Sequence, residues 1–284
     1  MALAGDPEPR RALVVSSGLH GVEGFAGSAI QAALLEDALG GWTPPAGLRV
    51  ALVHALNPYG FAWLRRVDAD NVDLNRNFLL EGEAYEGAPE GYDELDPLLN
   101  PPTPPSLLDP FLLQAVAKIA RTGLGALSRS VASGQYTHPR GLYFGGSGPS
   151  RTQEILRRNL GRWTGGAERV LHLDVHTGLG RWGQCALLAD TTEQAEALSV
   201  ALDLPVHGPS SLQAGEFAAR GGLGPWCRER FGEGYDVVVV ELGTVGRLRV
   251  VTALRAEHRA HSYGQRDHPS TERAKEALRE IFAP

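Results

Sequence analysis

Short apolar runs alternate with amphipathic segments along most of the chain. The runs at 11–17 (RALVVSS) and 47–56 (GLRVALVHAL) are typical of buried strands, and the second ends at the expected turn NPYG. Between them, residues 27–39 (GSAIQAALLEDAL) have apolar positions at helical spacing. The order strand, helix, strand predicts the repeating unit of a mostly parallel sheet.

The remaining chain continues this alternation. Further strands are expected at 169–176, 183–190 and 235–243. Helices are expected at 108–121, 150–163, 192–202, 249–261 and 270–282, and a second short helix follows the first and ends at about 132. The run YDVVVVELG is the most apolar in the chain and predicts a central, fully buried strand. Without an internal repeat or a composition shift, residues 1–284 are expected to form a single α/β domain, an α/β/α sandwich around a mixed, mostly parallel sheet.

One segment interrupts the alternation, at about 79–106. Residues 81–105 are acidic, contain no basic side chain and are rich in proline and glycine. This composition predicts a long loop or a partly disordered insertion. Two interpretations stay open: a solvated excursion, or a rim over an active site.

Composition and charge argue against a nucleic-acid-binding, membrane-spanning or disulfide-rich protein. The formal net charge is −6, which does not indicate a nucleic-acid partner. The first apolar run is too short to span a membrane and is followed by no cleavage-type pattern. Cys185 and Cys227 form no CxxC pair and suggest no disulfide framework, so a cytoplasmic protein with reduced thiols is expected.

A histidine and a glutamate follow the first strand, in GLHGVEG. His20 and Glu23 stand between that strand and the next helix, where ligands bind in open α/β sheets. The pair is either part of a metal site or a polar turn that caps the helix. A catalytic zinc ion takes three protein ligands and keeps one position for water, so a third ligand is expected at another strand end.

The segment HLDVHTG supplies two candidates for that ligand, His172 and His176. They are four residues apart and therefore share one face of a strand. His176 lies at the carboxyl end and is the expected ligand, whereas His172 is expected to be a packed core histidine. Asp174 is expected on the opposite face of the strand, so it is not assigned as the partner of His176.

Two more segments carry candidate chemistry. Glu241 interrupts a run of valines, and such a carboxylate is either a salt-bridged structural group or a general base with a raised pKa; its place at a strand end favours the base. The segment RRVDADNVDLNRNF contains Arg65, Arg66, Asn75 and Arg76. The planar guanidinium of arginine suits a carboxylate.

Taken in order, GLHGVEG, VDLNRNF, LDVHTG and VVELGT resemble the zinc carboxypeptidase family and the related aspartoacylase and succinylglutamate desuccinylase enzymes. The resemblance implies a zinc-carboxypeptidase-like fold and one Zn²⁺ per chain. It also implies these roles: His20, Glu23 and His176 as zinc ligands, Glu241 as the general base acting on zinc-activated water, Asn75 and Arg76 as the grip on the substrate carboxylate, and Arg66 as the group that polarises the scissile carbonyl. Arg65 stays an alternative to Arg66.

The chain departs from both branches of this group. Carboxypeptidases carry a substrate-binding tyrosine before the late glutamate, but residues 177–234 contain no tyrosine. The aspartoacylase-like enzymes carry a β domain after the catalytic one, whereas only some forty residues follow Glu241 here, and they are expected to be helical. The stretch GQYTHPRGLYFGG at 134–146, with Tyr136, His138 and Arg140, either lines the substrate pocket or is an ordinary loop.

The resulting hypothesis is a zinc metallohydrolase that cleaves an amide bond next to a free carboxylate. Its substrate is a peptide, as for a metallocarboxypeptidase in proteolysis, or alternatively an N-acyl amino acid. A non-catalytic binding protein on the same scaffold is a third alternative. A serine hydrolase is the weakest, because GGSGP has proline where the nucleophile elbow needs glycine. The sequence does not indicate an oligomeric state.

Overall fold

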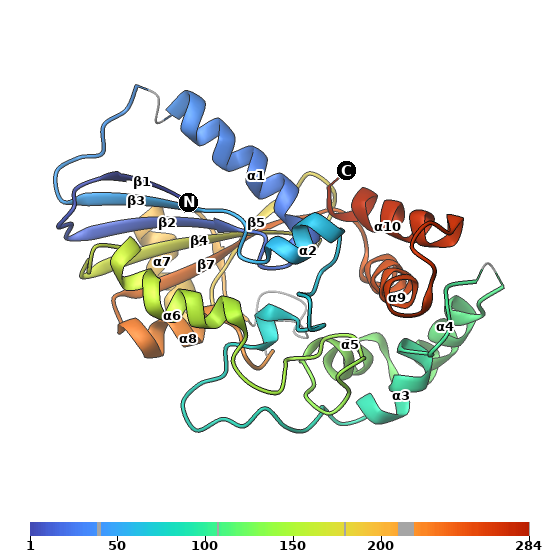
Figure 1. Cartoon of the computed structure of the whole chain (residues 1–284). Helices are drawn as coiled ribbons and strands as arrows, with labels where there is room; N and C mark the ends of the chain where they lie inside the picture. Colours follow the sequence, from blue (N-terminus) through green and yellow to red (C-terminus); the bar gives the residue numbers. More distant parts are fainter. Residues whose placement is uncertain (39–40, 107, 179, 210–218, 284) are drawn as a thin grey trace.

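The computed structural model describes residues 1–38, 41–106, 108–178, 180–209 and 219–283. Within these residues, seven strands form one sheet in the order β1-β3-β2-β4-β7-β5-β6 (Figure 1). The strands are β1 (Ala2–Gly5), β2 (Arg11–Ser17), β3 (Leu48–Val53), β4 (Arg169–Thr177), β5 (Cys185–Leu188), β6 (Val206–His207) and β7 (Tyr235–Leu242). The α-helices are α1 (Gly24–Ala33), α2 (Pro58–Trp63), α3 (Tyr92–Leu99), α4 (Phe111–Thr122), α5 (Leu124–Ala132), α6 (Arg151–Trp163), α7 (Thr192–Leu202), α8 (Leu223–Phe231), α9 (Arg247–Tyr263) and α10 (Pro269–Phe282). Short 3₁₀ helices lie at Gly21–Glu23 and Leu74–Arg76, and a π-helix lies at Leu34–Ala38.

The sheet is mixed and mostly parallel, as the sequence predicts. The central strands β3, β2, β4 and β7 run parallel to one another, and β5 runs parallel to β6. Only β1 and β5 pair antiparallel with their inner neighbours β3 and β7. Because the central strands are parallel, β2, β4 and β7 end at the same edge of the sheet.

Helices cover both faces of the sheet. On one face, α1 contributes Ile30 to a cluster with Val15, Val50 and Val175. On the other face, Leu156 of α6 and Trp226 and Cys227 of α8 pack with Val14 and Val170. Figure 1 shows α1 above the sheet and α6 and α8 below it. The predicted α/β/α sandwich is therefore confirmed.

A second core lies beside the sheet and includes the acidic segment. Tyr92, Leu95 and Leu99 of α3 are buried in one apolar cluster with residues of α4, α5, α9 and α10, and α3 lies beside α4 and α5 (Figure 1). The expectation of a loop or partly disordered insertion is wrong for these residues. Their spacing of three and four residues is that of one helix face, which the surrounding prolines, glycines and acids obscured in the sequence.

Four other elements also differ from the prediction. The expected turn NPYG is the start of α2, where the side chain of Asn57 accepts a hydrogen bond from Gly60 N at 2.8 Å and Pro58 occupies the first helical position. The strand β6 and the helix α8 were not predicted at all. The helix expected at 27–39 begins earlier, at Gly24, and residue 39 lies outside the described residues.

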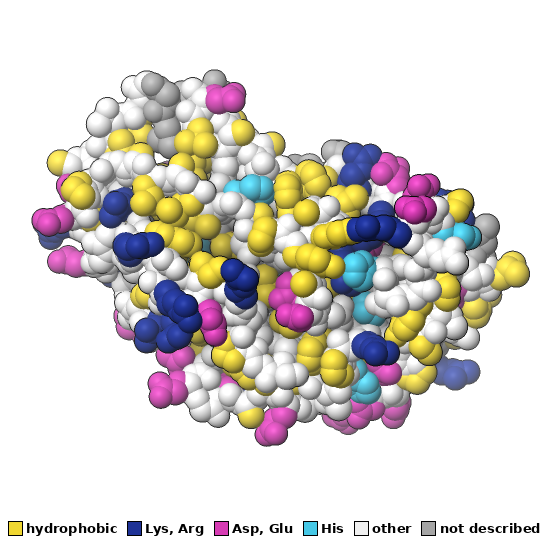
Figure 2. Space-filling view, in the orientation of Figure 1, with side chains coloured by type: hydrophobic (Ala, Val, Ile, Leu, Met, Phe, Trp, Pro, Cys, Tyr) yellow, Lys and Arg dark blue, Asp and Glu magenta, His cyan; other side chains and the backbone are white. Residues whose placement is uncertain are grey.

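Three further features of the described residues are the composition of one surface, the length and polarity of the helices, and the state of the cysteines. Acidic, basic and apolar side chains are interspersed over the face seen in Figure 2. Across the described ranges, no helix combines the length and the apolar character needed to cross a bilayer. Cys185 is exposed, Cys227 is buried, and both are free thiols.

Helix α1 packs against β2 through a glycine, and this contact yields a test of the packing. A Cβ atom on Gly27 would lie 2.2 Å from Ser17 Cβ, whereas a Cβ atom on Gly161 of α6 would meet only Phe231 Cε1 at 3.7 Å. We expect Gly27→Ala to lower the free energy of unfolding by ~1–3 kcal/mol through overpacking. We expect Gly161→Ala to raise it by ~0.5–1 kcal/mol, because alanine favours the helix. Urea unfolding measures both, and a stabilising effect of Gly27→Ala would contradict this packing.

Candidate metal centre and its cavity

The turn after β2 is built on two glycines. Gly18 adopts a φ of +68°, which lets the chain reverse directly after the strand. Gly21 packs against the backbone of α2, since a Cβ atom there would lie 2.1 Å from the carbonyl carbon of Gly60. This turn places His20 and Glu23 at the carboxyl edge of the sheet.

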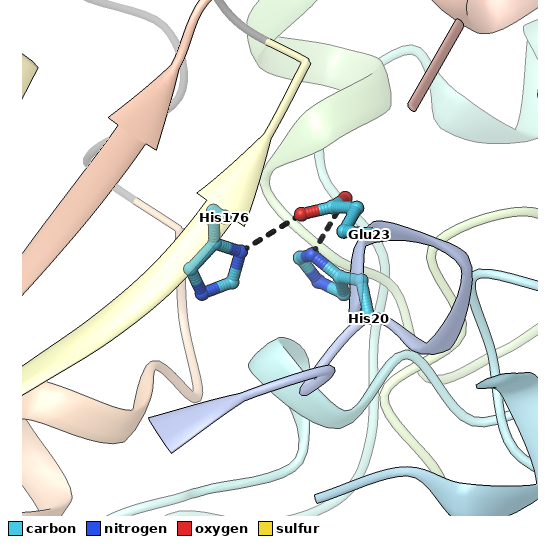
Figure 3. A group of neighbouring side chains, drawn as sticks. All are labelled: His20, Glu23 and His176. Carbon is cyan, nitrogen blue, oxygen red and sulfur yellow. Dashed lines mark hydrogen bonds and ion pairs between the residues drawn. The ribbon is translucent and has the colours of Figure 1, made fainter. Parts of the chain in front are cut away.

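His20, Glu23 and His176 meet at that edge (Figure 3). Glu23 Oε1 lies 3.0 Å from His20 Nδ1, and Glu23 Oε2 lies 3.0 Å from His176 Nδ1. One potential ligand atom from each of the three residues falls within 4.8 Å of the others. All three side chains are buried. Residues from two strand ends, 153 positions apart between Glu23 and His176, thus converge on one point.

Each histidine is held from behind by an aspartate. His20 Nε2 donates to Asp73 Oδ1 at 3.0 Å, and His176 Nε2 donates to Asp174 Oδ2 at 2.7 Å. Because each Nε2 donates to a carboxylate, each Nδ1 is turned towards Glu23. A carboxylate behind a histidine in this way orients the ring and increases its basicity as a metal ligand.

The prediction for Asp174 was therefore wrong. Residues two apart in a strand point to the same face, so Asp174 shares its face with His176 and is its partner. Asp73 was missed altogether, although it stands two residues before Asn75 in the segment that the sequence had singled out.

A chain of buried polar groups continues beneath Asp174. Ser16 of β2 donates its hydroxyl to Asp174 Oδ1, and His172 Nε2 donates to Ser16 Oγ at 2.8 Å. His172 Nδ1 lies 3.1 Å from the hydroxyl of Tyr235. Burial lowers the pKa of His172 to about 4, against the weaker attraction of Asp174, so its ring is neutral at pH 7. His172 is buried, as expected, but its role in the fold is to support Asp174 by way of Ser16.

The buried charges compensate one another. Burial raises the pKa of the Glu23 carboxyl, but His20 and His176 outweigh burial and hold the pKa below its usual value. Burial lowers the pKa of His176, but Asp174 and Glu23 outweigh it and raise the pKa well above its usual value. The raised pKa favours the protonated form of His176, and a metal ion that bound at this nitrogen would have to displace the proton.

The donor set fits zinc. Two imidazole nitrogens and one carboxylate oxygen make up a known catalytic zinc set with a position left open. His20 Nδ1 is fully buried and has no hydrogen-bond partner among the described residues, because its approach to Glu23 Oε1 lacks hydrogen-bond geometry. A buried nitrogen lone pair without a donor is what a metal ion at this point would satisfy.

The structure distinguishes the two neighbouring arginines. The backbone of residues 65–66 accepts hydrogen bonds from Gly21 N and Val22 N, which fixes the two side chains in different directions. Arg66 enters the site, where its Nε donates to Asp73 at 2.9 Å and its Nη1 to Glu23 at 3.1 Å. Arg65 pairs with Glu257 of α9 at 3.1 Å, outside the site.

Asn75 and Arg76 lie beside this cluster. Asn75 Oδ1 accepts a hydrogen bond from Leu223 N at 3.1 Å. Arg76 is buried, and its Nε and Nη1 donate to the carbonyl oxygens of Ala132 and Asn75 at 2.8 and 2.7 Å. No carboxylate of the described chain forms an ion pair with Arg76, in contrast to Arg66.

The predicted site residues surround one cavity of about 180 Å³. Its lining includes all seven of them: His20, Glu23, Arg66, Asn75, Arg76, His176 and Glu241. Glu241 is buried and stands opposite His176 in the register of β4 and β7. The remaining wall comes mainly from β5, β7 and the start of α8.

The stretch at 134–146 reaches the cavity through a residue that the sequence did not single out. Tyr143 lines the cavity, with its ring centroid 5.4 Å from Arg66 Cζ and 5.9 Å from Arg76 Cζ. Tyr136 and His138 do not line the cavity; Tyr136 donates to Arg76 O at 2.7 Å, and His138 bonds to Asp93. The serine of GGSGP, Ser147, is exposed, and no histidine of the described chain is its hydrogen-bond partner.

Comparisons with known proteins place the chain in a family. The family described as "Protein of unknown function (DUF2817)" matches residues 1–284, so the chain belongs to it. No curated protein matches the chain.

Solved structures share the fold at low identity. They include a carboxypeptidase A from Helicoverpa armigera (13% identical, TM-score 0.47, covering 98% of this chain and 63% of that one), the murein-tripeptide amidase MpaA from Escherichia coli O157 (17%, 0.45, 90% and 83%) and a succinylglutamate desuccinylase from Chromobacterium violaceum (16%, 0.45, 98% and 62%). The chain thus spans less than two thirds of the carboxypeptidase and of the desuccinylase. The names of the carboxypeptidase and of the desuccinylase belong to the enzyme groups that the four sequence motifs resemble.

The cluster predicts that zinc binding is lost when a ligand is removed and weakened when the residue behind a ligand is changed. We expect about one zinc ion per chain in the wild type and none in His20→Ala, because two remaining ligands do not make a zinc site. Asp174→Asn should keep the stoichiometry but weaken zinc binding ~10- to 100-fold, since it removes the charge behind His176. Competition with a chromophoric chelator measures the affinities.

The control for this series is His138→Gln, which removes a histidine outside the cluster and should bind zinc as the wild type does. Equal zinc binding by the wild type and by His20→Ala would contradict a metal centre at this position.

Proposed function

We propose that this member of the DUF2817 family is a zinc-dependent hydrolase that cleaves an amide bond next to a free carboxylate, with the chain forming one catalytic domain. One observation supports this most: Arg76, a buried cation that forms no ion pair with a carboxylate of the described residues, lines the same cavity as the His20–Glu23–His176 cluster. A buried unpaired charge is costly, so a site that retains one is suited to an anionic ligand.

The substrate carboxylate would bind at Asn75 and Arg76. Arg76 uses Nε and Nη1 for backbone carbonyls and retains Nη2 for a ligand. Asn75 uses its oxygen to accept from Leu223 N and retains its amide N–H groups. Together these donors match the two oxygens of a carboxylate. Tyr143, which lies over both arginines, covers the same region and is the candidate for the tyrosine missing between 177 and 234.

The reaction follows from the groups around the cluster. His20, Glu23 and His176 would hold the zinc ion, which would supply a Lewis acid for the carbonyl and lower the pKa of water towards ~7. Glu241 accepts a proton from the attacking water and returns it to the leaving amine. Arg66 stabilises the oxyanion through Nη2, since Asp73 and Glu23 occupy its Nε and Nη1.

A second candidate is the hydrolysis of an N-acyl amino acid. A small apolar cavity of about 70 Å³, lined by residues such as Leu95, Leu99 and Phe111, shares Ala132 and Tyr143 with the catalytic cavity. Such a neighbour suits an apolar acyl group as well as an apolar residue of a peptide. A panel of peptides and N-acyl amino acids decides between the two substrate classes. Binding of these ligands without any hydrolysis would support the non-catalytic alternative.

Removal of the base tests the chemistry. We expect Glu241→Gln to bind zinc normally but to lose at least ~100-fold in kcat, because the amide cannot accept the proton. Steady-state kinetics and zinc analysis of the same preparation measure both quantities. Glu280→Gln, an exposed change on α10, is the control, and near-normal turnover by Glu241→Gln would exclude this mechanism.

Removal of the Arg76 side chain, which is proposed to bind the substrate carboxylate, tests the substrate class. For the wild type, we expect kcat/KM to fall at least ~10-fold when the terminal carboxylate of a substrate is replaced by an amide. In Arg76→Ala, the acid should lose most of this advantage while the amide changes little. The ratio of the two kcat/KM values is the measurement, and an unchanged ratio in Arg76→Ala would place the carboxylate elsewhere.

A further inference from the structure

Asp190 lines the catalytic cavity away from the metal cluster. It follows β5 by two residues, whereas His176 and Glu241 lie at the ends of β4 and β7. Leu188 of β5 stands opposite Val239 in the antiparallel pairing with β7, two residues before Glu241. The cavity therefore extends from the cluster along the face of the sheet towards Asp190.

The start of α8 contacts both Asp190 and Asn75, which belongs to the proposed binding site for the substrate carboxylate. Leu223 N donates to Asn75 Oδ1, and the next residue, Gly224, packs directly on the carboxylate of Asp190. A Cβ atom on Gly224 would lie 1.8 Å from Asp190 Oδ2, so only glycine allows this contact. Asn75 and Asp190 therefore contact consecutive residues at the start of α8, and both line the same cavity.

The Asp190 carboxylate has no hydrogen-bond or ion-pair partner in the described part of the chain, although its backbone N–H donates to Gln194. Arg228 and Cys227 of α8 are the titratable groups that act on it. The guanidinium of Arg228 donates to Asp236 at 2.7 Å and to Glu233 at 3.0 Å, and so does not neutralise Asp190 directly. Burial raises the pKa of Asp190 to about 6, and the attraction of Arg228 opposes this rise only in part.

The wall between the cluster and Asp190 is mostly apolar. It is formed by Leu188, Val237 and Val239 of the sheet and by Leu223 and Pro225 of α8. An apolar passage that ends at a carboxylate matches a side chain with an aliphatic stem and a cationic end. Neutral apolar side chains would leave the carboxylate partly desolvated and without a partner.

We propose that Asp190 determines specificity, by binding the cationic end of the side chain on the substrate residue whose carboxylate is held at Asn75 and Arg76. The substrate class is then a peptide or N-acyl derivative that ends in lysine, arginine or another diamino acid. This inference rests on the proposed function and adds the identity of the terminal residue. Asp190 binds and selects; the hydrolysis is left to the groups around the cluster.

The direction of a pH effect follows from the same contact. A cation binds the ionised form of Asp190, so KM for a cationic substrate rises as pH falls through about 6. A neutral substrate of the same shape does not show this rise. The difference between the two pH profiles isolates Asp190 from groups that act on both substrates.

The experiment compares an N-acyl-lysine with the N-acyl-norleucine that has the same stem without the ammonium group. The wild type should prefer the lysine substrate at least ~10-fold in kcat/KM at pH 7.5. Asp190→Asn should abolish this preference mainly through KM and remove the difference between the pH profiles. Glu196→Gln, which removes an exposed carboxylate on α7, should keep both. Norleucine hydrolysis retained by Asp190→Asn shows that the variant is folded.

A binding measurement separates this inference from the proposed function. Calorimetry with free lysine and free norleucine reports on the cavity whether or not any substrate is hydrolysed. Tighter binding of lysine by the wild type, lost in Asp190→Asn, supports the inference even if no amide is cleaved. Equal treatment of the two side chains by the wild type, in binding and in any hydrolysis, overturns it and leaves the proposed function standing.

Discussion

The buried carboxylate of Glu23 constrains the whole site. It contacts His20, His176 and Arg66, and almost none of it reaches solvent. A carboxylate is costly to bury unless it is paired and hydrogen-bonded, so the chain must deliver all three partners to one point. That requirement determines the sharp turn at Gly18, and it explains why the backbone beside Arg66 is bonded to this same turn.

The parallel sheet meets this requirement by bringing strand ends together. β2, β4 and β7 are neighbours, so the residues after β2 and those ending β4 and β7 share one edge. The polar groups then continue inward instead of ending at the edge. Asp174 and Ser16 lie on the same face, between the helices α6 and α8 and the sheet, and they stabilise His176 from within the core. The site is thus anchored in the strands, while α8 and the segment around Tyr143 complete its walls.

Sequence patterns predicted those parts of the structure that depend on local periodicity or on residue type at a strand end. The central strands, most helices and the candidates His20, Glu23, His176 and Glu241 belong to this group, whereas Arg66, Asn75 and Arg76 were expected from the family resemblance. Relations between side chains were harder to predict. Arg65 and Arg66 are the same residue type, and only the folded structure distinguishes them, because Arg66 pairs with Glu23 and Asp73 in the cavity whereas Arg65 pairs with Glu257. Asp174 was misplaced by an error about strand alternation. Helix α8 was missed because glycine and proline in its first turn hide its apolar face.

The balance of buried charge favours a divalent cation over a purely polar turn. Glu23, Asp73 and Asp174 bring three carboxylates into a region almost without solvent, and Arg66 brings one permanent positive charge. With neutral histidines, these four side chains together carry a net charge of −2. In the metal-free protein, the raised pKa of His176 returns only one positive charge. A divalent ion at the point where the three side chains meet neutralises the cluster and leaves both histidines in the form that binds metal. Arg76 lies in the same buried region and contributes to the lowered pKa of Asp73, but it forms no ion pair with a carboxylate of the described chain.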